Sequence, residues 1–468
     1  MIKVIPIALS CLSTVAIVGC GGAPRAVTWP EARPWGADLP SYRAPRHPIP
    51  TDEDARAFAE PGGQLTQHDA FAAALLHNRD LATFAWDVRI REARALQASL
   101  PPNPEIELEL EEFGGTGDAS AFDAAETTAL FSQLIELGQK RRKRTRLAEL
   151  NQDLAAWEYE TARVRVLTSV ARAFIATLVL QQQTELANRN QALAREAYDT
   201  IDKRVAAGAA ASLDRTNASV VVARAGIELQ RRRRALASAR VDLASTWGSR
   251  EPAFQRVDGD LTQLKTLPTL EVLSSLIDQN PQIARWTVEM TQRQARIDLD
   301  RAGAMPDVTV GVGAKYLGES EDTAAVVQLS MPLPIFDRNQ GAVLESRYAL
   351  AKARAARRAA ELRVGTALGR AWRRLAAAHE EVTALQADVL PAARRAFEDT
   401  NVAYRQGKVG YLSVIDAQRT FFDTRGQVVG ALGAYHQAVV DVEGLIGRRL
   451  STLDEPRPNE TQSTGDQP

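Results

Sequence analysis

The sequence has very little cysteine and few histidines. Of its 468 residues only Cys11 and Cys20 are cysteines, and Cys11 lies inside an apolar N-terminal stretch. One further cysteine cannot form an internal disulfide or a CxxC metal site. The five histidines are scattered, and no pair has the spacing of metal ligands. We therefore expect no resident metal and no cofactor.

Catalytic patterns, an excess of one charge and long apolar runs are absent as well. No Ser–His–acid, Cys–His or phosphate-loop arrangement occurs, so we expect no enzymatic activity. The balance of 57 Lys and Arg against 58 Asp and Glu gives no argument for nucleic-acid binding. Beyond the N-terminus no run reaches the roughly 18 apolar residues of a transmembrane helix. If the chain spans a membrane, it must do so with strands.

The N-terminus has the pattern of a targeting segment, which we assign to residues 1–19. Lys3 precedes an apolar stretch, residues 4–18, that is too short to span a membrane. The stretch ends in Gly19-Cys20 and resembles a bacterial lipoprotein cleavage box, in which the cysteine becomes the lipidated first residue. We expect lipidation of Cys20; an ordinary secretory signal with an incidental cysteine is the alternative. Residues 20–64 are rich in proline and are expected to form an extended tether.

The remaining sequence is an internal repeat. Gly208 and Gly407 are each followed by a leucine five residues later and an alanine ten residues later. Asn78 likewise matches Asn280. Repetition of this length predicts an architecture that reuses one unit of helix, two strands, very long helix, tight turn and helix. We place the first repeat at residues 65–256, the second at 257–450, and a disordered tail at 451–468.

The predicted strands have two different faces. Residues 105–111 alternate strictly between glutamate and an aliphatic residue, which predicts a strand with one acidic and one apolar face. Further strands are expected at about 127–135, 308–316 and 324–331, which gives four strands in two hairpins. The acidic residues are Glu105, Glu107, Glu109 and Glu111. They would face a water-filled lumen if the apolar face contacts lipid, either as rings that attract cations or merely as a polar lining.

Very long helices are expected between the strands and the turns. Residues 139–205 contain no proline and no glycine, and their apolar positions recur at spacings of three and four. Such a helix would be about 100 Å long. The equivalent helix spans about 341–405 and contains Pro391, where we expect a kink.

The whole arrangement resembles the TolC-type outer-membrane efflux proteins. The resemblance rests on the duplicated unit, on Pro104 and Pro306 before the strands, on residues 134–141 and on the repeated Gly-x4-Leu-x4-Ala turns. Residues 332–341, PLPIFDRNQG, are similar to the subgroup that serves heavy-metal cation efflux pumps.

The resemblance implies a mixed α and β fold and a homotrimer. Three chains, each with four strands, would form a twelve-stranded outer-membrane β-barrel continued by a long periplasmic α-helical barrel, with the tether running along the β-barrel. The function implied is a passive outer-membrane channel of a tripartite efflux system for heavy-metal cations. Its partners would be outer-membrane lipid, a periplasmic adaptor (membrane fusion protein) and an inner-membrane pump of the resistance-nodulation-division type, with no nucleic acid. Organic compounds or type I secreted polypeptides are alternative cargoes, and a periplasmic coiled-coil scaffold lipoprotein is the alternative of another class.

The resemblance also places the two turns at a periplasmic tip that closes the channel. The family uses acidic residues and a tyrosine there, and a further acidic position of the family is Ser413 in this chain. We expect a hydrogen bond between Tyr404 and Asp214 that holds the channel shut. The matching positions are Gly208, Asp214, Tyr404, Gly407 and Asp416.

Overall fold

The structure is a computed structural model that describes residues 29–46, 60–117, 120–122 and 124–453. The predicted signal peptide, Cys20 and nearly all of the predicted tail lie outside the described residues and stay predictions. The chain divides into two compact units. Among the described residues, unit 1 comprises 90–153 and 288–354, and unit 2 comprises 29–89, 154–287 and 355–453.

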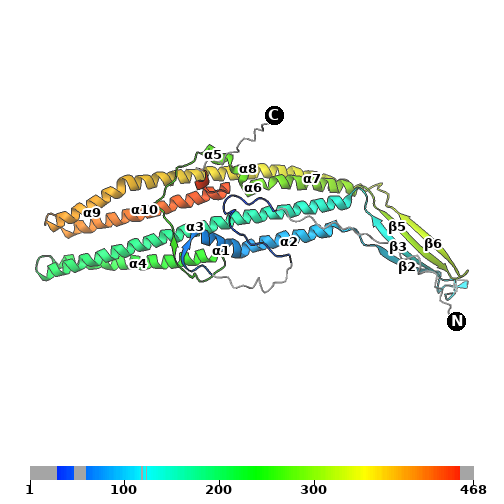
Figure 1. Ribbon diagram of the computed structural model, residues 1–468, viewed down its shortest axis with the longest axis horizontal. Coiled ribbons are helices and arrows are strands. Elements are labelled where there is room, and N and C mark those ends of the chain that lie inside the picture. Colours follow the sequence, from blue (N-terminus) through cyan, green and yellow to red (C-terminus); the bar gives the residue numbers. More distant parts are fainter. Residues whose placement is uncertain (1–28, 47–59, 118–119, 123, 454–468) are drawn as a thin grey trace, which may run out of the picture. The chain divides into compact units, whose positions relative to one another are not determined.

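Unit 1 contains one antiparallel sheet of four strands in the order β2, β3, β5, β6 (Figure 1). The strands are β2 (Glu105–Glu111), β3 (Glu126–Ile135), β5 (Val308–Leu317) and β6 (Asp322–Ser330). These are the four strands predicted from the alternating pattern, because a period of two is a strong local signal. Within the described residues the outer edges of β2 and β6 pair with no other strand.

Two further strands in unit 2 were not predicted. β1 (Gly63–Thr66) and β4 (Phe254–Asp258) pair in parallel, with Leu65 and Val257 buried. The count of four strands per chain is therefore too low, and the expected boundary between the repeats, at 256–257, falls inside β4. Strands this short carry no measurable alternation, so only the pairing of distant segments reveals them.

The long helices form as predicted. α3 (Lys140–Ala206) has 67 residues and is followed by α4 (Ser212–Ser245). In the second half, α8 (Gln340–Ala384) is followed by the π-helical segment Leu385–Val389, α9 (Leu390–Arg405) and α10 (Tyr411–Ile446). The π-helical segment lies directly before Pro391, which has no N–H to donate and whose ring crowds the preceding turn. A π-helical segment therefore lies next to the position of the expected kink, and the bend itself stays a prediction.

Short helices complete the two repeats. They are α1 (Gln67–His77), α2 (Arg79–Ser99), α5 (Leu270–Ser275), α6 (Pro281–Ala284), α7 (Trp286–Gly303) and the 3₁₀ segments Ile277–Gln279 and Leu450–Thr452. The matched asparagines make equivalent hydrogen bonds in the two halves. Asn78 Nδ2 donates to the carbonyl of Thr246 at 2.8 Å, and Asn280 Nδ2 donates to that of Leu445 at 2.8 Å. Each asparagine thereby satisfies a carbonyl at the end of a returning helix that has no partner within its own helix.

Among the described residues one helix, α3, contains an 18-residue stretch that would suit a membrane span by length and composition. The expectation that no such stretch exists is therefore wrong. Half of this stretch is buried within the chain, as is usual for the core helix of a soluble domain.

The described part of the proline-rich tether, residues 29–46, packs within unit 2. The side chain of Trp35 is 1% exposed, and the backbone N–H of Trp35 donates to the carbonyl of Gly447. Arg163 of α3 is paired with Glu160 and donates to the carbonyls of Arg33 and Gly36. These residues contain a turn at 34–39 and pack against helices of unit 2 and not against the strand sheet, so the path of the whole tether stays a prediction. A proline-rich sequence indicates an extended backbone, but it does not show against which surface the segment packs.

Candidate functional site

The sheet of unit 1 has one apolar face that is exposed to solvent. Strand register aligns Ile106, Phe131, Val312 and Val327 in one row across all four strands. Directly paired residues point to the same face, so this row lies on one side of the sheet. The four side chains are 76%, 43%, 53% and 78% exposed, respectively.

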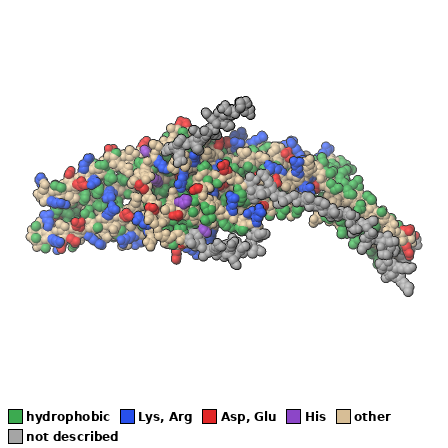
Figure 2. Space-filling view, viewed as in Figure 1, with side chains coloured by type: hydrophobic (Ala, Val, Ile, Leu, Met, Phe, Trp, Pro, Cys, Tyr) green, Lys and Arg blue, Asp and Glu red, His purple; other side chains and the backbone are tan. Residues whose placement is uncertain are grey.

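Neighbouring rows extend the same face. Leu108 and Leu329 are each 74% exposed, and Val310 pairs directly with Leu329. Figure 2 shows hydrophobic side chains gathered over the strand region. Soluble monomers rarely expose a contiguous apolar surface spread over four strands. The face is therefore built to contact lipid or another protein.

The opposite face of the sheet is polar. The structure brings Glu105, Glu107, Glu109 and Glu111 to that face of β2, as the alternation predicted. Lys315 of β5 lies 3.6 Å from Glu111 and forms an ion pair with Glu126. Lys315 thus neutralises one end of the acidic row, whereas none of the other three glutamates has an ion pair in the described part of the chain.

Leu130 is a residue of the polar face that sequence reasoning missed. Its side chain is 6% exposed although its neighbours on the same face, Glu107, Thr128 and Ser132, are polar. It packs over Gly311, where an added Cβ would lie 3.2 Å from Leu130. An added Cβ on Gly313 would come within 2.1 Å of the Ala129 carbonyl oxygen. The two glycines therefore allow a close approach of β3 and β5, and any larger residue at Gly313 would disrupt it.

The two turns at the ends of the long helices have the same backbone structure. Gly208 has a φ of 72° and Gly407 a φ of 73°. At the first turn the Gly208 N–H donates to the carbonyl of Val205, and the Ala209 N–H donates to that of Arg204. At the second turn the Gly407 N–H donates to the carbonyl of Tyr404, and the Lys408 N–H donates to that of Ala403. Both are Schellman caps, in which a left-handed glycine ends the helix and its last carbonyls are satisfied. Both glycines thus form the tight turns that the repeat predicted, and their place at a periplasmic tip stays a prediction.

Side chains from the two helical hairpins meet near these turns. Ile201 of α3, Ala218 of α4, and Tyr411 and Val414 of α10 form a small buried cluster, against which Tyr404 packs. The guanidinium of Arg204 lies over the Tyr404 ring at 5.0 Å from its centroid. The rings of Tyr404 and Tyr411 are 5.9 Å apart. Apolar packing and a cation–π contact therefore join the two hairpins.

The hydrogen bond expected between Tyr404 and Asp214 is not formed within the chain. Asp214 lies in the first turn of α4, near Tyr411. Burial, followed by the charges of Tyr404 and Asp214, raises the pKa of Tyr411. Asp416 is exposed on α10, and in the described residues it has no ion-pair partner. Arg204 could not be predicted from the sequence, since its partner Tyr404 comes from a distant segment.

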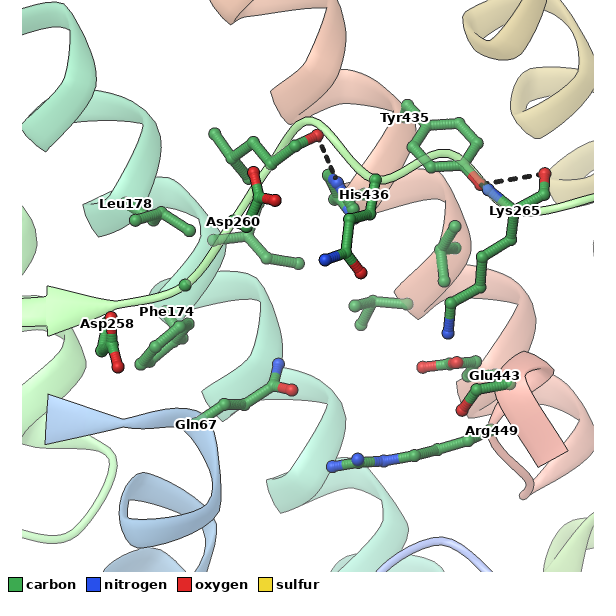
Figure 3. Close-up of a pocket in the computed structure, with 17 residues that line it drawn as sticks. Gln67, Phe174, Leu178, Asp258, Asp260, Lys265, Tyr435, His436, Glu443 and Arg449 are labelled. Carbon is green, nitrogen blue, oxygen red and sulfur yellow. Dashed lines mark hydrogen bonds between the residues drawn. The ribbon is translucent and has the colours of Figure 1, made fainter.

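Unit 2 also contains a cavity of about 330 Å³, shown in Figure 3. Three of its polar side chains are hydrogen-bonded to backbone. His436 Nε2 lies 2.9 Å from the carbonyl of Leu261, Tyr435 Oη accepts from the Lys265 N–H at 2.9 Å, and Glu443 accepts from the Leu450 N–H at 2.8 Å. These bonds hold the segment after β4 and the C-terminal segment against α10. Across the part of the chain that the structure describes, no group of three or more His, Cys, Asp or Glu side chains could hold a metal ion.

The chain is similar to known outer-membrane proteins over most of its length. The family model "Outer membrane efflux protein" matches residues 71–249 and again 272–448. The cobalt-zinc-cadmium resistance protein CzcC of Cupriavidus metallidurans is 32% identical over 389 residues, covering 83% of this chain and 91% of that protein. The pyoverdine export outer membrane protein OpmQ of Pseudomonas aeruginosa is 24% identical over 396 residues, covering 80% and 83%. The solved structure of CusC matches with a TM-score of 0.67 over 88% of this chain and 99% of CusC; at 18% identity it shows the fold alone.

Proposed function

The chain belongs to the outer membrane efflux protein family, and we propose that it is the outer-membrane channel through which a tripartite efflux system exports heavy-metal cations. The observation that carries this proposal is the contiguous exposed apolar face of the four-stranded sheet. A face of this kind is stable only when lipid or another protein covers it. The similarity to CzcC, over most of both chains, supports metal cations as the cargo.

The open edges of the sheet support a trimer. Four strands cannot close a barrel, and lipid cannot satisfy the free N–H and C=O groups of β2 and β6. Three copies joined edge to edge would give a closed barrel of twelve strands with the apolar face toward lipid. The long helices of the three copies would continue the channel into the periplasm.

The acidic face would then line the lumen. Glu105, Glu107 and Glu109 from three copies would form rings that attract cations, while Lys315 would moderate the charge near Glu111. Such rings would attract cations without a tight site, because a conduit must release its cargo. The channel itself would catalyse no reaction and would depend on an inner-membrane pump of the resistance-nodulation-division type.

The turn regions would form the periplasmic end, where the adaptor binds and the channel closes. The contact of Arg204 with Tyr404 joins two hairpins of one chain, so its loss would allow the hairpins to separate. Asp416, exposed on α10, would favour cations at this constriction. Cys20 would carry the lipid that holds the mature N-terminus at the membrane.

The cargo can be tested in the host cell by deleting the gene and restoring it on a plasmid. We expect the deletion strain to lose tolerance to cobalt, zinc or cadmium salts and to accumulate the metal, and the plasmid to restore both. OpmQ is named for pyoverdine export, so secretion of organic chelators is measured in the same strains. Unchanged metal tolerance together with lost chelator secretion would overturn the proposed cargo but leave the channel. Extraction of the protein without detergent would instead favour the periplasmic scaffold.

A further inference from the structure

The linker between β6 and α8 exposes several large apolar side chains close together in the sequence. Leu333, Ile335 and Phe336 are 70%, 61% and 89% exposed. We call residues 332–337 the knob segment. It follows directly on β6, the strand at one open edge of the sheet.

Hydrogen bonds hold the end of the knob segment in one conformation. Ile335 N–H donates to the carbonyl of Leu333 at 2.8 Å, and Gln340 Nε2 donates to that of Phe336 at 3.1 Å. Asn339 Nδ2 donates to the carbonyl of Asp300 on α7 at 2.6 Å, which ties the linker to a helix. A linker fixed in this way presents its apolar side chains at little further entropic cost to a partner.

A groove lies beside the opposite edge of the same sheet, where α2 ends and β2 begins. Its volume is about 450 Å³. The lining residues include Arg94, Gln97, Leu100, Pro101, Pro102 and Arg144. Arg144 shapes the groove, since its guanidinium pairs with Glu136 and donates to the carbonyls of Ala98 at 3.1 Å and Leu100 at 3.2 Å. Leu100 is 40% exposed, and among the described residues Arg94 has no ion-pair partner.

Strand direction places the knob segment of one copy beside the groove of the next. β3 is antiparallel to β2, β5 to β3, and β6 to β5, so β6 runs opposite to β2. If β6 of one copy pairs with β2 of another in the same alternation, the end of β6 meets the start of β2. Residues just after Ser330 then lie next to residues just before Glu105. Those are the knob segment and the groove.

We propose that the knob segment of each chain inserts into the groove of a second copy and clasps neighbouring chains together at the base of the sheet. The inference rests on the proposed edge-to-edge assembly. Phe336 and Leu333 would cover Leu100, Pro101 and Pro102, and Asp337 would lie within reach of Arg94. A second copy fits better than lipid tails, because hydrocarbon could not satisfy the guanidinium of Arg94.

Cysteine cross-linking of the full-length chain in membranes tests the clasp. Phe336→Cys is combined with Leu100→Cys, and the two single variants control for any participation of Cys20. The matched control pairs Leu100→Cys with Phe113→Cys. Phe113 is 50% exposed but follows the far end of β2, a seven-residue strand that spans about 23 Å. Mild oxidation should link Phe336→Cys with Leu100→Cys into covalent dimers and trimers on heated, non-reducing gels, and should leave the control pair monomeric.

A second pair of variants measures the contribution of the clasp to assembly. Phe336→Ser should lower the temperature at which the unheated oligomer dissociates in detergent, whereas Phe113→Ser should leave it unchanged. An oligomer that persists without cross-links, or with equal cross-links in both pairs, would overturn the clasp and leave the proposed channel intact. If neither the wild-type chain nor any variant forms a detergent-resistant oligomer, the proposed channel and the clasp are both wrong.

Discussion

At the scale of single residues, the contact between Arg204 and Tyr404 replaces the hydrogen bond that the sequence suggested. A cation–π contact at a partly exposed site contributes about 0.5–1 kcal/mol. Because the Tyr404 hydroxyl makes no bond to Asp214, Tyr404→Phe should leave the contact intact. Arg204→Gln and Tyr404→Leu should both weaken the closed tip and raise single-channel conductance in planar bilayers.

Arg215→Gln is the matched control for the gate. Arg215 pairs with Asp202 at 3.5 Å, but this exposed ion pair joins α3 to α4 within one hairpin. Its removal should change conductance little. If Arg215→Gln and Arg204→Gln open the channel equally, loss of positive charge at the tip, and not the contact between hairpins, sets the closed state.

Glu443 is a buried carboxyl group whose charge opposes folding. Burial raises its pKa above the ordinary 4.5, although the Leu450 N–H and the charges of Arg449 and Lys265 lower it. The folded chain then binds this proton more tightly than the unfolded chain, so its contribution to stability falls as pH rises above about 4.5. Glu443→Gln keeps an oxygen for the Leu450 N–H and should raise the melting temperature at pH 7–8.

The gain from Glu443→Gln should shrink as the pH approaches 4.5 and vanish below it. Thermal unfolding across this pH range measures the effect, with the exposed Glu380→Gln as a control that should show no such trend. A variant less stable than the wild type at every pH would mean that Arg449 or Lys265 requires the carboxylate.

At the scale of elements, the two turns require glycine because of their backbone conformation and not because a side chain would lack space. No atom lies within 4 Å of a Cβ built on Gly208 or Gly407, yet both have φ above 70°. Gly208→Ala or Gly407→Ala should therefore destabilise unit 2 by about 1–2 kcal/mol, the cost of a left-handed residue. Gly426→Ala, in the interior of α10 and also without a neighbour, should instead stabilise it by about 0.5–1 kcal/mol. Chemical denaturation compares the three; equal effects would contradict the cap assignment.

The two faces of the sheet should respond differently to charge. Leu108→Arg or Val310→Arg should cost about 2–4 kcal/mol near the bilayer midplane and reduce the amount of oligomer in membranes. Thr309→Arg, one residue away on the polar face, should be tolerated. Quantitative gels of unheated membrane extracts measure the oligomer. Similar yields for all three variants would place the apolar face in water or against protein instead of lipid.

Elements with a long, regular period could be predicted from the sequence, and irregular or distant ones could not. The alternation around Leu108 fixes both the strand and its faces, because neighbouring residues must point to opposite sides. The uninterrupted period of α3 defines a helix of 67 residues. β1 and β4 were missed since each is too short for a period and gains its partner only from the fold. Arg204 was missed for the same reason, whereas both turn glycines carried a local signal.

At the scale of the whole molecule, one chain has surfaces that lipid or further copies would cover. The apolar face, the open edges of β2 and β6, the knob segment and its groove all lie in unit 1. Unit 2 instead contains most of the buried apolar residues and uses residues 29–46 as part of its own packing. Assembly should therefore depend on unit 1, and closure of the channel on the turns of unit 2.

Single-channel recording of the purified, full-length oligomer in planar bilayers tests the central claim most directly. With a salt gradient across the bilayer, we expect discrete conductance steps and a reversal potential that shows cation selectivity. Replacing Glu105, Glu107 and Glu109 by glutamine should reduce that selectivity, since their charges would line the lumen. The double variant Arg204→Gln and Tyr404→Leu is recorded as well, because a channel that is intact but closed would also show no conductance. No conductance from a stable oligomer, even in that double variant, would contradict a channel, and anion selectivity would contradict a conduit for metal cations.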